Sequence, residues 1–68
     1  MRDKEYDEIS GTIAEVTDKA ILVDIKGTRG EHWIPRSVIE DGDEINENDI
    51  GEDLEFMVES WFVDKEGL

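Results

Sequence analysis

The fold is decided by Ala20-Ile21-Leu22-Val23-Asp24-Ile25, a short and nearly continuous apolar run. A run of this length, rich in β-branched residues, is typical of a strand that is buried on both faces. A second β-branched segment precedes it at residues 9–16, and Thr17-Asp18-Lys19 between the two has the composition of a turn. The two glycines in residues 26–30 suit a hairpin connection on the other side. The first half of the chain therefore predicts antiparallel strands.

The second half of the chain continues the β pattern. Residues 31–34 predict a third strand, which Pro35 ends or confines to the edge of a sheet. Residues 35–39 predict one helical turn that starts with the proline. Residues 54–59 alternate apolar and polar side chains, with Leu54, Phe56 and Val58 on one face, and this alternation predicts a half-buried strand.

The C-terminal segment predicts one short helix over residues 61–65. Ser60 can cap its N-terminus, and Gly67 lies where such a helix stops. Trp61 in this segment and Trp33 in the third strand are large apolar side chains, so we expect both in the structural core, where they hold the helix against the sheet.

The predicted fold is mainly β: a small antiparallel β-barrel with a short C-terminal helix, SH3-like or alternatively OB-like. We expect residues 1–8 to form a flexible acidic N-terminus and residues 9–68 to form a single domain. A core this small makes a homodimer through an edge strand conceivable. The 68 residues contain no cysteine, no apolar run of about 20 residues and no signal-peptide pattern, so we expect a cytoplasmic protein.

Negative charge is concentrated in one half of the chain. The net charge is −13, to which residues 1–36 contribute −2 and residues 37–68 contribute −11. Ile45 and Ile50 are the residues we expect to anchor the most acidic stretch to the core. That stretch carries nine acids with no base between them: Glu40, Asp41, Asp43, Glu44, Glu47, Asp49, Glu52, Asp53 and Glu55. Its simplest functions are solubility or adaptation to salt, and a polyanion-like binding surface is the alternative.

Sequence patterns for catalysis and metal binding are weak. Asp41-Gly42-Asp43 opens like a calcium loop, but Ile45 occupies the fifth position and Asn46 occupies the sixth, where the turn needs glycine. The single histidine, His32, alternates with Trp33 in a predicted strand and is a poor candidate for a catalytic base. We therefore expect no enzyme, no metal site and no cofactor.

Three separated blocks of the chain form a pattern. They are Thr17-Asp-Lys-Ala-Ile-Leu-Val23, Trp33-Ile-Pro-Arg-Ser37, and Glu59-Ser-Trp61 with Lys65-Glu-Gly-Leu68. The pattern covers most of residues 12–68 and resembles a group of small uncharacterised proteins of phages and mobile elements. The resemblance implies a setting among phage replication and recombination functions, and it brings no catalytic residues. The acidity of residues 40–55 departs from the group.

The charge predicts the kind of partner. Nucleic acid binds proteins through cationic contacts to phosphate, so the −11 half opposes direct binding. The same charge suits a protein that occupies the basic channel of a nucleic-acid-binding protein, such as an RNA-guided nuclease. In this respect the chain is similar to the small acidic phage inhibitors of the anti-CRISPR and anti-restriction type. The alternative is an accessory protein of phage replication or recombination that binds a protein or single-stranded DNA through Lys26, Arg29 and Arg36.

Overall fold

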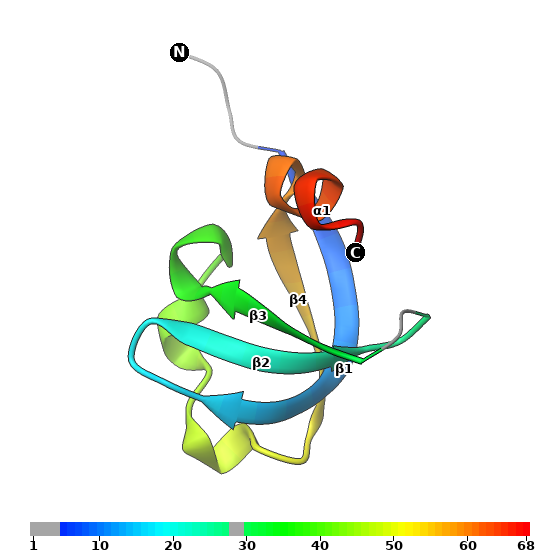
Figure 1. Cartoon of the computed structure of the whole chain (residues 1–68). Helices are drawn as coiled ribbons and strands as arrows, with labels where there is room; N and C mark the ends of the chain where they lie inside the picture. Colours follow the sequence, from blue (N-terminus) through cyan, green and yellow to red (C-terminus); the bar gives the residue numbers. More distant parts are fainter. Residues whose placement is uncertain (1–4, 28–29) are drawn as a thin grey trace.

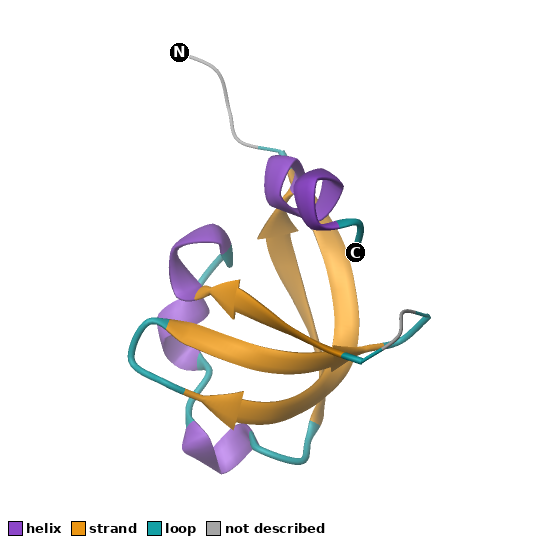
Figure 2. Ribbon diagram, in the orientation of Figure 1, coloured by secondary structure: helices purple, strands orange, loops and turns teal. Residues whose placement is uncertain are grey.

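The computed structural model describes residues 5–27 and 30–68 (Figure 1). Within these residues, four strands form one antiparallel sheet in the order β3-β2-β1-β4, and a helix follows the last strand. The strands are β1 (Tyr6–Val16), β2 (Ala20–Ile25), β3 (Glu31–Pro35) and β4 (Asp53–Glu59), and the helix is α1 (Ser60–Glu66). Three short 3-10 turns, η1 (Arg36–Val38), η2 (Gly42–Glu44) and η3 (Glu47–Asp49), lie between β3 and β4 (Figure 2).

The long strand β1 organises the sheet, because it pairs with β4 through its first half and with β2 through its second half. It is strongly curved (Figure 1). A bulge at Ala14 shifts the register between Ile13 and Glu15, so the inward-facing positions change parity beyond it. At Gly11 a Cβ atom would lie 2.6 Å from the carbonyl oxygen of Asp24, so only glycine allows β1 and β2 to approach this closely.

The sheet is not closed into a barrel. Strands β3 and β4 are its two edges, and a single antiparallel bridge, Ile39 with Val58, links the segment after β3 to β4. The Glu40 N–H donates to the Met57 carbonyl at 2.9 Å beside this bridge, after which the chain turns away into the acidic stretch. The prediction is thus confirmed as a mainly β fold with an antiparallel sheet and a short C-terminal helix, and the predicted barrel closure is absent from the described residues.

The core lies on the concave face of the sheet. Its buried members include Ile21, Val23 and Ile25 of β2, which all point to this face. The expectation that β2 is buried on both faces was wrong, because the outer face carries no covering layer: Leu22 is half-buried there and Asp24 is exposed. Along β4, Phe56 and Val58 are buried and Leu54 packs against the core, as the alternation predicts.

Helix α1 starts directly after β4 and buries Phe62 and Val63. The predicted Ser60 cap is wrong, since Ser60 is the first helical residue and the cap position is taken by Glu59, without a side-chain hydrogen bond. The predicted stop is confirmed: Gly67 has φ 71°, and its N–H donates to the Val63 carbonyl at 2.9 Å.

Both tryptophans lie at the surface, contrary to expectation. Trp33 is 50% exposed on the outer face of β3, and Trp61 is 55% exposed on α1. The strand and helix periodicities assign the buried positions to Ile34 and to Phe62 and Val63 instead. Trp61 Nε1–H donates to Glu59 Oε1 at 2.6 Å, so its position is fixed by a polar contact.

The boundaries at the N-terminus also differ from the prediction. Residues 1–4 lie outside the described part of the chain, but residues 6–8 belong to β1 and pair with residues 57–59 of β4. They were expected in a flexible tail because they are polar, whereas the backbone pairing with β4 is what holds them. In the described ranges, no helix has the length and apolar character that crossing a membrane requires.

Candidate protein-binding surface

Residues 40–52, here called the acidic loop, are folded into consecutive turns. Around η3, Asn46 and Asp49 form a reciprocal capping box: the Asn46 side chain accepts from the Asn48 N–H at 2.9 Å, and Asp49 Oδ2 accepts from the Asn46 N–H at 3.0 Å. Ile45 is buried and anchors the loop as predicted. The matching expectation for Ile50 was wrong, since its side chain is 42% exposed beside the turn.

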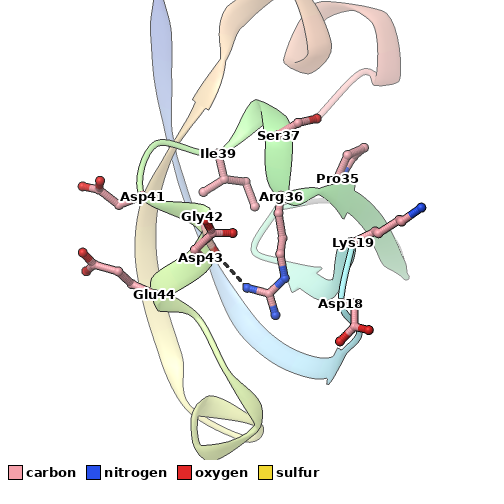
Figure 3. A pocket seen from close by; sticks show the side chains of 10 residues that line it. All are labelled: Asp18, Lys19, Pro35, Arg36, Ser37, Ile39, Asp41, Gly42, Asp43 and Glu44. Atoms are coloured by element: carbon pink, nitrogen blue, oxygen red, sulfur yellow. Dashed lines mark hydrogen bonds between the residues drawn. The ribbon is translucent and has the colours of Figure 1, made fainter.

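Arg36 fastens the acidic loop to the sheet (Figure 3). Its Nη1 donates to the carbonyl oxygens of Gly42 at 2.6 Å and of Ile45 at 2.5 Å, and its Nε donates to that of Thr17 at 3.0 Å. A guanidinium with its donors in a fixed fork suits such a junction of three backbone segments. Arg36 therefore has a structural role, and its alternative assignment to a side that binds a protein or single-stranded DNA stays a prediction.

Of the predicted basic side, the structure describes Lys26 and Arg36 and does not bring these two together. Lys26 follows the last residue of β2 and Arg36 follows the last residue of β3, so the antiparallel pairing places them at opposite ends of this hairpin. The third candidate, Arg29, lies outside the described residues. Lys26 instead lines a depression of about 380 Å³ together with Asp53 and Glu55.

The nine predicted acidic residues are accessible but do not form one face. Eight are exposed and Asp49 is half-buried. A surface depression of about 790 Å³ lies between the Asp18–Lys19 turn and η2. Figure 3 shows the side chains of Asp41 and Glu44 pointing away from Arg36, on the side of η2 opposite Asp18. Asp53 and Glu55 stand in β4, and Glu55 lines a depression of about 280 Å³ together with Glu40, Asp41 and Glu44 of the acidic loop.

A second set of carboxylates, which the sequence did not reveal, lies on the outer face of the sheet. Asp24 pairs with Glu31 across β2 and β3, Thr12 pairs with Asp24, and Thr12 also pairs with Asp53. These four residues form one transverse row through all four strands, at about 4.8 Å per strand. Thr12 Oγ1–H donates to Asp53 Oδ1 at 2.5 Å and confirms that the two side chains share this face.

Three further acids belong to the same face. Glu15 is opposite Leu22, Ser10 is opposite Glu55, and Glu8 is opposite Met57, all at outward positions. We call the whole set the outer acidic face. Its six exposed members are Glu8, Glu15, Asp24, Glu31, Asp53 and Glu55.

Four members of the outer acidic face come from the half of the chain whose net charge is only −2. Linear charge density therefore could not find them. The strand parity of residues 20–25 and 31–34 was the available signal, since it already places Asp24 and Glu31 opposite the inward-facing Val23 and Ile34.

The geometry offers little for metal binding. Across residues 5–27 and 30–68, no three histidine, aspartate or glutamate side chains converge as metal ligands would. The carboxylates of the acidic loop point outward from turns, and those of the outer acidic face stand side by side on strands. Both arrangements leave most of the carboxylates exposed.

Comparison of the chain with protein-family models, with curated proteins and with solved structures gives no match. The resemblance to small proteins of phages and mobile elements therefore stays a prediction. The function has to be argued from the residues themselves.

Proposed function

We propose that this protein is a non-enzymatic binding module whose acidic surface, chiefly the outer acidic face, docks on the basic nucleic-acid channel of a partner protein. By occupying that channel, it competes with the partner's own DNA or RNA. A nuclease guided by RNA is one partner of this class, and a phage or mobile element is the proposed source.

The observation that carries the proposal is the row Glu31, Asp24, Thr12, Asp53 across all four strands. Like charges directly opposite each other in a sheet are destabilising, and Asp24 and Glu31 form such a pair. A domain of this size has a small stability margin. A cationic partner that neutralises these charges would remove the cost to stability, which favours binding.

The backbone under these charges also supports the proposal. The residues that carry the carboxylates are held by backbone pairing with neighbouring strands, on both sides for Asp24 and on one side for Glu31 and Asp53, so the carboxylates keep their spacing with little further loss of backbone freedom on binding. The acidic loop adds to the negative electrostatic potential around these carboxylates, because Arg36 holds the loop against the same domain. A strong negative field speeds association with a cationic partner by about 10–10³-fold at low salt.

The alternative, single-stranded DNA binding on a basic side, has less support. Arg36 is engaged by three backbone carbonyls, and Lys26 lies beside Asp53 and Glu55. Binding of single strands relies on a cationic groove combined with aromatic stacking. Trp33, the aromatic side chain that the described part of β3 exposes on the outer face, lies near the carboxylates of Glu31 and Asp24, which repel phosphate.

The test is capture of partners from a host extract on the immobilised protein, followed by elution at about 0.5 M salt. We expect the eluted proteins to be basic nucleic-acid-binding proteins, and we expect added duplex DNA to displace them. A matched capture uses the triple variant Glu15→Gln, Asp24→Asn, Glu31→Gln and should recover much less of the same proteins. Equal recovery by this variant, or binding that DNA does not compete with, would contradict the proposal.

A further inference from the structure

The outer face of the β2–β3 hairpin carries an exposed aromatic residue within the acidic surface. Trp33 stands opposite Leu22, and its side chain is 50% exposed although Leu22 is half-buried. The neighbouring outward pair, Ala20 with Pro35, is also half-buried. The indole thus lies on a small apolar patch of an edge strand, with one large part of its surface open to solvent.

Carboxylates border this patch. Glu31 lies two residues before Trp33 on the same face of β3, about 6.6–6.8 Å along the strand. Asp24 stands directly across from Glu31, and Glu15 stands across from Leu22 on the other side of the patch. All three acids are exposed. An exposed indole and two adjacent like charges therefore share one surface.

We infer that Trp33, Asp24 and Glu31 form a binding site for an arginine side chain of the partner protein. This inference rests on the proposed function and specifies which cation the outer acidic face selects. A guanidinium is planar, stacks on aromatic faces and forms paired hydrogen bonds with a carboxylate. It can cover the Trp33 indole while its edge meets the carboxylates of Asp24 and Glu31. The compact ammonium of lysine neutralises the charge but stacks less well.

Other occupants fit this surface less well. A nucleobase can stack on Trp33, but its phosphates would meet the carboxylates of Glu15, Asp24 and Glu31. A second copy of this chain would bring another net −13 to the same surface. Charge complementarity therefore favours a protein segment rich in arginine.

The test is a titration of the whole protein, labelled with ¹⁵N, with two peptides of equal length and charge, one of arginine and one of lysine. The two indole N–H signals are followed, and Trp61 serves as the internal control because it lies on α1 and donates to Glu59. We expect the arginine peptide to shift the Trp33 signal selectively and to bind about two- to fivefold more tightly than the lysine peptide.

Two variants identify the source of that preference. Trp33→Leu keeps an apolar side chain at an exposed position, and we expect it to abolish the preference for arginine while the lysine peptide binds as before. Asp24→Asn with Glu31→Gln should weaken both peptides. Equal binding of the two peptides to the unmodified protein, a preference that survives in Trp33→Leu, or a larger Trp33 shift with oligothymidine would overturn the inference.

These outcomes separate the inference from the proposed function. If both peptides bind equally and the carboxylate variant weakens both, the arginine site is rejected and docking through the acidic face stands. If neither peptide binds even at low salt, both fail.

Discussion

The acidic loop and the outer acidic face both carry clustered carboxylates, but the loop holds them on turns and the face holds them on paired strands. In the acidic loop the carboxylates are close in sequence, but successive turns direct them to different sides, and Arg36 and Ile45 attach the loop to the domain. On the outer acidic face the carboxylates come from all four strands, and the register places them on one side of the sheet, with Glu31, Asp24 and Asp53 in one row. Charge density along a chain therefore does not identify an ordered charged surface, whereas strand register does.

Truncating a core side chain of the sheet should destabilise the acidic loop and the outer acidic face together. Phe56 is buried under the β1–β4 pair, so Phe56→Ala should lower the free energy of unfolding by roughly 3–5 kcal/mol. Urea unfolding followed by circular dichroism measures this loss. An unchanged melting temperature would mean that β4 does not face the core as described.

Removing the attachment of the acidic loop should separate the two regions. Arg36→Met deletes three hydrogen bonds to backbone carbonyls, and a loss of about 1.5–3 kcal/mol is expected. Hydrogen exchange should accelerate at the Glu44 and Ile45 amides, which donate within η2, more than at the β1–β2 amides. Lys19→Met is the matched control, since it removes the same charge from an exposed position. Equal exchange in both variants would show that Arg36 does not hold the loop.

Relieving the like-charge pair should stabilise the sheet slightly. Asp24→Asn removes repulsion from Glu31 and should raise the free energy of unfolding by about 0.2–1 kcal/mol at low salt, with a smaller gain at about 0.5 M. Glu47→Gln in the acidic loop is the control and should gain less. Thermal melts at the two salt concentrations compare them, and a gain that does not depend on salt would refute the repulsion.

The smallest effect is expected at Trp33. Because half of its surface is already exposed, Trp33→Leu should change the free energy of unfolding by no more than about 0.5 kcal/mol. A larger loss of free energy, measured by urea unfolding, would show that Trp33 contributes to core packing, as its size suggests.

Hydrophobic periodicity predicted the positions of the strands. Features that depend on contacts between residues distant in sequence were not predicted. Residues 54–59 alternate as predicted, with Phe56 buried, whereas residues 20–25 form the predicted strand but bury only one face, the face that carries Ile21. Trp33 was misassigned because its size was weighed above its parity: Ile34 beside it takes the inward position. The role of Arg36 was not predictable, since the three carbonyls that it binds come from two turns distant in sequence, at Thr17 and at Gly42 and Ile45, and carry no side-chain signature.

The central claim is that register on the sheet, more than charge density in the loop, makes the docking surface. It is tested by two variants that each raise the net charge from −13 to −10: Glu15→Gln, Asp24→Asn, Glu31→Gln on the outer acidic face, and Asp43→Asn, Glu44→Gln, Glu47→Gln in the acidic loop. The measurement is the affinity of each for one arginine peptide by titration calorimetry at fixed salt. We expect the face variant to lose about tenfold and the loop variant to lose about two- to threefold, because only the face charges are held in one plane. Equal losses, or a greater loss for the loop variant, would contradict the account.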